Sequence, residues 1–147
     1  MSPAAVHILV VEDFTPFRSL LTSLLQQRPE WQVVAEVSDG SQAVQKAKEL
    51  SPDLILLDIG LPNLNGIEAA RRILEIAPKS RILFISQESS ADVVREALAV
   101  GTHGYVLKLN AASELSAAVE SVLKGKRFVS SGLNGDGSSG AEDLDTT

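Results

Sequence analysis

The chain has 147 residues, of which 44% are hydrophobic and 22% charged, and its formal net charge is −6. This length suits one domain of ordinary size, and the composition is that of a globular protein rather than a disordered one. A nucleic-acid surface needs clustered Lys and Arg, so we expect that this acidic chain itself binds no nucleic acid. The nearest approach to a basic patch is Lys124, Lys126 and Arg127, which we expect at a helix C-terminus, where positive charge offsets the helix dipole.

The chain contains no cysteine, which excludes disulfides and thiolate chemistry. Residues 1–5 lack the charged region and cleavage site of a signal peptide, and no apolar stretch approaches the length of a transmembrane span. We therefore expect a cytoplasmic protein without membrane contact.

Apolar runs of strand length alternate five times with segments of helical periodicity. In chain order, the predicted strand and helix pairs are His7–Val11 with 16–28, Trp31–Val37 with Gly40–Leu50, Asp53–Leu57 with Ile67–Ala77, Arg81–Ile85 with Ala91–Val100, and Gly104–Leu107 with Ser113–Leu123. Thr15 is the expected N-cap of the first helix, with Pro16 at its first position. Gly66 suits a turn that needs positive φ.

Five consecutive βα units predict a doubly wound α/β fold, a five-stranded parallel sheet with five helices on its two faces and right-handed crossovers. The third strand, the most hydrophobic, is expected at the centre. Beyond Phe128 the composition changes to Ser, Gly, Asp and Asn. We therefore predict one domain over residues 1–128 and a disordered, acidic Ser/Gly-rich tail or linker over residues 129–147.

Polar side chains stand at the ends of four predicted strands, namely Glu12 and Asp13, Asp58, Ser86, and Lys108. Ligands of open parallel sheets bind beyond the carboxyl ends of the strands, so these groups are expected to converge. Crowded carboxylates repel one another unless a cation intervenes, and their hard oxygen atoms suit Mg²⁺ or Mn²⁺. With the ion bound, one carboxylate can attack phosphorus while the ammonium and hydroxyl groups neutralise the phosphoryl oxygens. A single Asp after a strand is usually a helix cap and a single Lys is usually solvated, so the joint placement carries the prediction.

These residues belong to four motifs: Glu12-Asp13, the segment DLILLDIGLPNLNG from Asp53 to Gly66, the run LFIS ending at Ser86, and GYVLK from Gly104 to Lys108. Over Val6–Phe128 the chain resembles the receiver domains of two-component response regulators, of the subgroup usually joined to LuxR-type helix-turn-helix outputs. The resemblance implies a flavodoxin-like sheet of strand order 2-1-3-4-5. It also implies a phosphoacceptor switch rather than a turnover enzyme, phosphorylated by a sensor histidine kinase and able to form a homodimer on phosphorylation.

The resemblance also assigns roles to individual residues. Asp58 is expected to be the phosphoacceptor and a metal ligand, with Glu12, Asp13 and the backbone carbonyl of Gly60 completing the metal site. The same resemblance makes Ser86 the switch hydroxyl, Lys108 the partner of the phosphoryl group, and Tyr105 the aromatic side chain that swings inward on activation.

Two departures from the family pattern affect these expectations. Leu109 follows Lys108 where many receivers have a proline in a cis peptide bond, so the isomer here is left open. Gln87 stands where small residues are frequent, which predicts narrower access and slow reaction with small phosphodonors. Gly60, Gln87 and Glu88 resemble the variable positions that tune dephosphorylation, and the lifetime of the phosphorylated form is not predictable from them.

Three other interpretations compete with a phosphoacceptor switch that acts as a stand-alone receiver. A phosphatase of the haloacid dehalogenase type uses Asp-x-Asp, but Gly60 stands two residues after Asp58 and leaves no general acid. A flavin or dinucleotide carrier needs a Gly-rich or hydroxyl-rich loop after the first strand, where Glu12 and Asp13 would repel phosphate. The third is that this sequence is the N-terminal receiver of a longer LuxR-type DNA-binding regulator, rather than a stand-alone receiver. The cognate kinase, stimulus and output are not encoded in any recognisable pattern.

Overall fold

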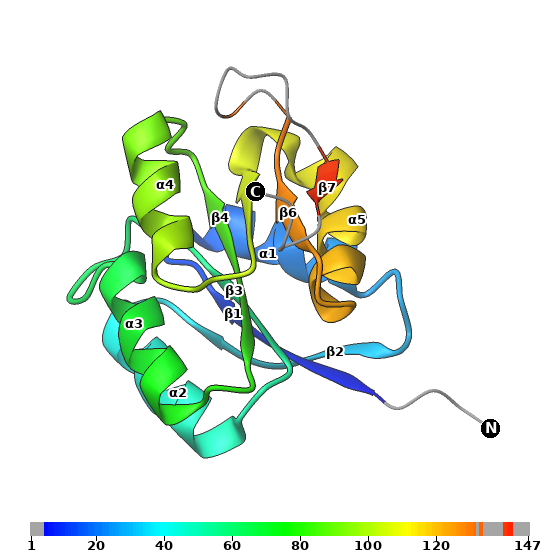
Figure 1. Ribbon diagram of the computed structural model, residues 1–147. Coiled ribbons are helices and arrows are strands. Elements are labelled where there is room, and N and C mark those ends of the chain that lie inside the picture. The colour runs from blue at the N-terminus through cyan, green and yellow to red at the C-terminus, as the bar shows by residue number, and fades with distance from the viewer. Residues whose placement is uncertain (1–4, 132, 134–139, 143–147) are drawn as a thin grey trace.

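The computed structural model describes residues 5–131, 133 and 140–142, and within them five βα units follow one another (Figure 1). The strands of these units are β1 (Val6–Val11), β2 (Trp31–Val37), β3 (Leu54–Leu57), β4 (Arg81–Ser86) and β5 (Gly104–Leu107). The helices are α1 (Thr15–Leu25), α2 (Gly40–Leu50), α3 (Gly66–Ile76), α4 (Ala91–Ala99) and α5 (Ala111–Leu123), with a single 3₁₀ turn at Lys108–Asn110 before α5. The predicted alternation of strands and helices is confirmed.

The strands form one sheet in the order β2-β1-β3-β4-β5-β6-β7. Strands β1 to β5 pair in parallel and in the expected order 2-1-3-4-5. Two short strands extend the sheet beyond β5. β6 (Arg127–Val129) runs parallel to β5, and β7 (Gly140–Glu142) runs antiparallel to β6. Neither was predicted, because three-residue strands carry too little periodicity to stand out from a polar, Gly-rich context.

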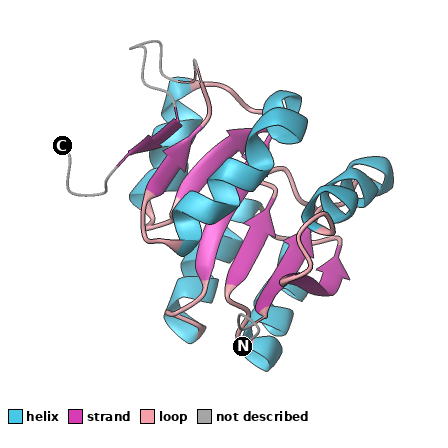
Figure 2. Ribbon diagram, turned by 90° about the vertical axis from the view of Figure 1, so that its right-hand side faces the viewer, coloured by secondary structure: helices cyan, strands magenta, loops and turns pink. Residues whose placement is uncertain are grey.

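The sheet is covered on both faces, which explains its continuous apolar strands (Figure 2). Alternate residues of each strand point to opposite faces, so Ile8 and Leu54 pack in the core with α1 and α5. Leu9 and Ile55, their neighbours along the chain, pack in the core with α2, α3 and α4. All four residues of β3 are buried, as expected for a central strand.

The starts of two helices differ from the sequence-based expectation. Thr15 is the first residue of α1 rather than its N-cap, and Phe14 holds the N-cap position without any side-chain hydrogen bond. Gly66 opens α3 without positive φ, which Asn63 adopts instead. A Cβ atom on Gly66 would lie 2.0 Å from the backbone oxygen of Asp58. Glycine is therefore required there by the close approach of α3 to the end of β3, and not by backbone conformation.

The ordered chain extends beyond the boundary expected at residue 128. Val129 lies in β6, and Ser130 and Leu133 are buried. The Ser130 hydroxyl oxygen accepts a hydrogen bond at 2.9 Å from the backbone N–H of Leu107, at the end of β5, and donates one to Glu114 on α5. Residues 132, 134–139 and 143–147 of the expected tail lie outside the described residues, so the division into domain and tail stays a prediction.

None of the helices in the part of the chain that the structure describes has the length and apolar character needed to cross a lipid bilayer.

Gly66→Ala is expected to lower the free energy of unfolding by about 3 kcal/mol, because the added methyl group forces α3 away from the backbone of Asp58. Gly60→Ala is the matched control. A Cβ there meets no atom within 4 Å, so the change is expected to stay below about 0.5 kcal/mol. Urea unfolding of the two variants measures the difference, and equal stabilities would contradict the close-approach explanation.

Candidate functional site

Four strands bring their polar end residues to one edge of the sheet. Asp58 directly follows β3, and Glu12 and Asp13 directly follow β1, which pairs with β3 through Val11 and Leu57. Ser86 is the last residue of β4, and Lys108 follows β5. The register aligns Ser86 with Leu107, the residue before Lys108. The structure therefore brings together all the strand-end groups that the sequence singled out.

The acidic cluster consists of Glu12, Asp13 and Asp58. One carboxylate oxygen of each lies within 4.8 Å of those of the other two. Glu12 is fully buried and Asp58 is 6% exposed, whereas Asp13 faces solvent. Three negative groups at this spacing repel one another strongly unless a cation is shared among them.

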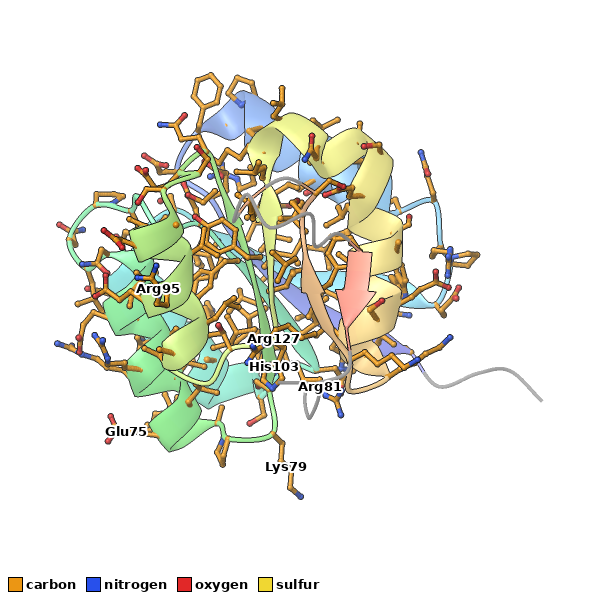
Figure 3. The ribbon with its side chains drawn as sticks, turned by 45° about the horizontal axis from the view of Figure 1, so that its top comes forward. Glu75, Lys79, Arg81, Arg95, His103 and Arg127 are labelled. Atoms are coloured by element: carbon orange, nitrogen blue, oxygen red, sulfur yellow. The ribbon has the colours of Figure 1, made fainter. Side chains whose placement is uncertain are left out.

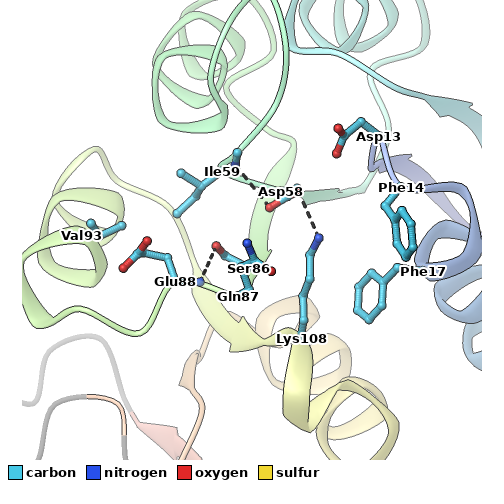
Figure 4. A pocket seen from close by; sticks show the side chains of 11 residues that line it. Asp13, Phe14, Phe17, Asp58, Ile59, Ser86, Gln87, Glu88, Val93 and Lys108 are labelled. Carbon is cyan, nitrogen blue, oxygen red and sulfur yellow. Dashed lines mark hydrogen bonds and ion pairs between the residues drawn. The ribbon is translucent and has the colours of Figure 1, made fainter.

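Lys108 supplies one such cation (Figure 4). Its Nζ lies 2.9 Å from Glu12 Oε1 and 3.2 Å from Asp58 Oδ2, and 4.9 Å from the centre of the Phe17 ring. Burial alone would lower the pKa of Lys108, but the close ion pair with Glu12 and the charge of Asp58 outweigh it and raise that pKa. Lys108 is therefore held protonated between the two buried carboxylates.

Glu12 retains capacity for a further positive ligand. Its Oε2 accepts a hydrogen bond at 3.0 Å from the backbone N–H of Phe14, while no hydrogen-bond donor is aligned with the buried Oε1, which has only the close charge of Lys108. Burial raises the pKa of Glu12, and repulsion from Asp58 adds to this, although Lys108 and the Phe14 N–H oppose it. A buried carboxylate oxygen without an aligned donor, beside two other carboxylates, fits a divalent cation with oxygen ligands.

Ser86, Glu88 and Tyr105 form a second set of contacts next to the acidic cluster. The Ser86 hydroxyl oxygen accepts a hydrogen bond at 3.1 Å from the backbone N–H of Glu88. The Tyr105 hydroxyl donates a hydrogen bond at 2.6 Å to the backbone carbonyl of Glu88. Tyr105 is fully buried, and burial raises its pKa, so the side chain already points inward in this structure. The backbone of Glu88 thus links the strand-end hydroxyl to the buried aromatic ring.

A pocket of about 660 Å³ opens over these groups. Its apolar wall includes Phe14 and Phe17 from the start of α1 and Val93 from α4 (Figure 4). Phe17 fits the apolar periodicity of α1, which by itself predicts a core position and no link to the site. Its short separation in sequence from Glu12 and Asp13 could have indicated its position, because it places Phe17 in the first turn of the helix that follows the acidic pair.

The remaining predicted positions lie at the mouth of the same pocket. Gly60, Gln87 and Glu88 are solvent-exposed and line it. The Gly60 backbone N–H donates to Asp58 Oδ1 at 3.3 Å. The peptide bond between Lys108 and Leu109, whose isomer the sequence left open, is trans.

Comparison with known proteins assigns this arrangement to a family. A family model described as the response regulator receiver domain matches residues 8–120. The chain is 34% identical over 124 residues to the transcriptional regulatory protein DegU of Brevibacillus brevis, covering 84% of this chain and 52% of that protein. It is 33% identical over 126 residues to the nitrate/nitrite response regulator protein NarL of Escherichia coli, covering 86% and 58%. The chain thus spans little more than half the length of these relatives.

Solved structures of receiver domains share the fold. The signal receiver domain of the putative response regulator NarL from Mycobacterium tuberculosis superposes with a TM-score of 0.79 at 31% identity, covering 84% of this chain and 99% of that one. A LuxR family two-component response regulator from Aurantimonas sp. SI85-9A1 gives a TM-score of 0.83 at 31% identity, covering 91% and 95%.

Glu12→Gln is expected to raise the free energy of unfolding at pH 7 in metal-free buffer by roughly 1 kcal/mol, because it removes a buried charge that is incompletely hydrogen-bonded. The folded-state pKa of Glu12 lies above its unfolded value, so the folded wild-type protein takes up this proton at a higher pH than the unfolded chain does. The free energy of unfolding of the wild-type protein therefore gains from acidification in this range. The advantage of the variant should therefore shrink as pH falls through that raised pKa toward the ordinary value.

Urea unfolding at pH 7 and pH 5 measures this difference. Glu75→Gln, an exposed carboxylate on α3, is the matched control and should change stability equally at both pH values. A stability advantage of Glu12→Gln that grew on acidification would contradict the assigned cause.

Proposed function

The chain belongs to the response regulator receiver family and is a receiver domain of two-component systems, and from that premise we propose that Asp58 accepts a phosphoryl group from a sensor histidine kinase. The observation that carries the proposal is the joint contact of Lys108 with Asp58 and the buried Glu12, because Lys108 and Asp58 also line a pocket. Structural ion pairs are normally sealed from solvent or lie on the surface, whereas Asp58 and Lys108 face a pocket large enough for a phosphoryl donor.

Glu12, Asp13 and Asp58 are the side chains that would hold Mg²⁺ or Mn²⁺, together with the backbone carbonyl of Gly60. When bound there, the divalent ion supplies positive charge to the phosphoryl oxygens in the transition state. The spacing of the three carboxylates and the unaligned Oε1 of Glu12 support this assignment.

In the proposed transfer, a carboxylate oxygen of Asp58 attacks the phosphorus of a phosphohistidine. The new P–O bond forms as the P–N bond breaks, and the departing imidazole nitrogen keeps the electron pair and takes a proton from solvent. The Lys108 ammonium group, already 3.2 Å from Asp58, pairs with the phosphoryl oxygens as charge accumulates on them. The product is an acyl phosphate on Asp58.

The same product would change the contacts of Ser86. A phosphoryl group on Asp58 offers its hydroxyl a strong, charged acceptor. Movement of Ser86 toward that acceptor would release the N–H of Glu88, whose carbonyl holds the Tyr105 hydroxyl. Phosphorylation would thus be transmitted to the surface beside α4 and β5, where we propose that a partner or a second copy of the chain binds.

We propose one transfer per activation rather than repeated turnover. The haloacid dehalogenase reading requires a general acid two residues after Asp58, and Gly60 provides none. A flavin carrier would have to bind its phosphate next to Glu12 and Asp13. These carboxylates lie close to Asp58, and the three negative groups would repel the phosphate. Gly60, Gln87 and Glu88 at the mouth of the pocket are the positions proposed to tune dephosphorylation.

The output of the whole protein is also a proposal. The relatives DegU and NarL are named as regulators, and this chain covers little more than half of each. Their length supports a receiver that is joined to a LuxR-type DNA-binding domain in a longer cytoplasmic regulator. A stand-alone receiver that acts through protein partners is the second candidate.

Asp58→Asn is expected to abolish Mg²⁺-dependent labelling by radioactive acetyl phosphate, because the amide is too weak a nucleophile to form the acyl phosphate. Asp53→Asn, the preceding acidic residue of the same segment, is the matched control and should still label. Mass spectrometry of the labelled chain locates the added phosphoryl group. Stoichiometric labelling of Asp58→Asn would rule out the assigned acceptor.

Gln87→Ala is expected to accelerate labelling by acetyl phosphate roughly threefold, a barrier change of less than about 1 kcal/mol, by widening access to Asp58. Gln45→Ala on the exposed side of α2 should leave the rate unchanged. Initial rates at saturating Mg²⁺ measure the effect. A slower reaction of Gln87→Ala would show that this side chain assists the transfer rather than restricting it.

A further inference from the structure

A second concentration of charge lies at the opposite edge of the sheet, where the amino ends of β4, β5 and β6 meet. Figure 3 shows Lys79, Arg81, His103 and Arg127 at this end of the molecule. Three of them, with Pro78 and Gly125, line a pocket of about 490 Å³. No carboxylate is among these lining residues.

The cations at this edge, unlike most others in the chain, form no ion pair with a carboxylate that the structure describes. Seven of the 13 lysine and arginine residues form ion pairs with carboxylates that the structure describes: Arg18, Arg28, Lys46, Arg71, Arg72, Arg95 and Lys108. The remaining six are Lys48 on α2 and the five cations of this edge, Lys79, Arg81, Lys124, Lys126 and Arg127. In a protein of net charge −6, positive groups without such partners are therefore gathered at one edge.

The negative ends of the helix dipoles compensate only part of this positive charge. Helices α3, α4 and α5 end at this edge, and Arg81 donates a hydrogen bond to the carbonyl of Val122 in the last turn of α5. Each helix C-terminus carries about half a negative charge, so three ends supply roughly −1.5 against five full positive charges. Asp53, the residue before β3, accepts a hydrogen bond from the backbone N–H of His7 on β1. More than half of the positive charge is left uncompensated by the helix ends.

The pocket also presents oriented hydrogen-bond donors. His103 Nδ1 accepts a hydrogen bond at 3.1 Å from the backbone N–H of Ile82, so the neutral ring carries its proton on Nε2 and can donate from there. Arg81 and Lys79 add a guanidinium and an ammonium group. Arg127, whose strand-register neighbour on β7 is Glu142, has a buried Nε without an acceptor among the described groups. Burial, then the charges of Arg81 and Arg127, lower the pKa of His103.

We propose that this pocket is a binding site for a small dissolved phosphate or phosphate ester, held by Lys79, Arg81 and His103. A phosphate accepts hydrogen bonds on several oxygens, and an ammonium group, an imidazole N–H and the guanidinium N–H groups of Arg81 that do not contact Val122 can donate them. The volume is in the range of small-molecule sites and leaves room for the organic part of an ester. This site is separate from Asp58 and does not depend on its phosphorylation.

The test is an NMR titration of the full chain with inorganic phosphate in EDTA, at constant ionic strength maintained with chloride. The chain has only two histidines, so the ring of His7 is an internal reference. His7 lies on β1, three strand spacings or about 14 Å from β5. The expected result is a saturable shift of the His103 ring resonances while those of His7 stay in place. A linear drift, or equal shifts of both rings, would overturn the proposal.

Variants separate a specific pocket from general attraction of anions. Lys79→Gln and Arg81→Gln are each expected to weaken phosphate binding at least about fivefold, the loss of one charge-assisted contact. Lys48→Gln removes a cation on α2 that likewise has no ion pair among the described residues, and it should leave the affinity unchanged. Because Arg81 also contacts α5, the exposed Lys79 keeps the test valid if Arg81→Gln unfolds. Equal weakening by Lys48→Gln would refute a specific site, and unchanged affinity in Lys79→Gln would overturn the proposal.

Discussion

The contact of Lys108 with Glu12 and Asp58 is the interaction on which the candidate site depends. Two carboxylates that are almost completely removed from water carry a large desolvation cost, and the ammonium group offsets it only while it stays between them. Two otherwise unrelated features hold it there. The Phe17 ring lies next to Nζ, and Ser130 fixes the backbone N–H of Leu107, the residue before Lys108.

One positive charge does not balance this site. Lys108 faces Glu12 and Asp58 directly, while Asp13 adds a third carboxylate from the solvent side. The excess of negative charge makes the pocket attractive for a divalent cation and repulsive to a bare phosphoryl group. The same electrostatic imbalance therefore explains both the fit to Mg²⁺ and the need for such an ion before a phosphoryl donor approaches Asp58.

Much of this arrangement was predictable, because parallel strands bring their carboxyl ends to one edge of a sheet. Once the five apolar runs were recognised, the positions of Asp58, Ser86 and Lys108 after three of them predicted their convergence. Residues whose role depends on side-chain direction were not predictable in the same way. Phe17 satisfies the helical apolar pattern equally well whether it faces the core or the pocket. Ser130 sits in a stretch whose composition is typical of linkers, and only its contact with β5 shows that it is part of the fold.

The two charged edges of the sheet are too far apart to influence each other through solvent. β4 joins them, with Arg81 at its first position and Ser86 at its last, and its five residue steps span about 17 Å. The Debye length at physiological ionic strength is about 8 Å, so the field of an anion in the basic pocket is largely screened at Asp58 along any solvent path. Coupling between the sites would have to pass through the strands themselves. β5 is the most direct route, since His103 precedes it, Lys108 follows it, and Tyr105 lies between them with its hydroxyl on the backbone of Glu88.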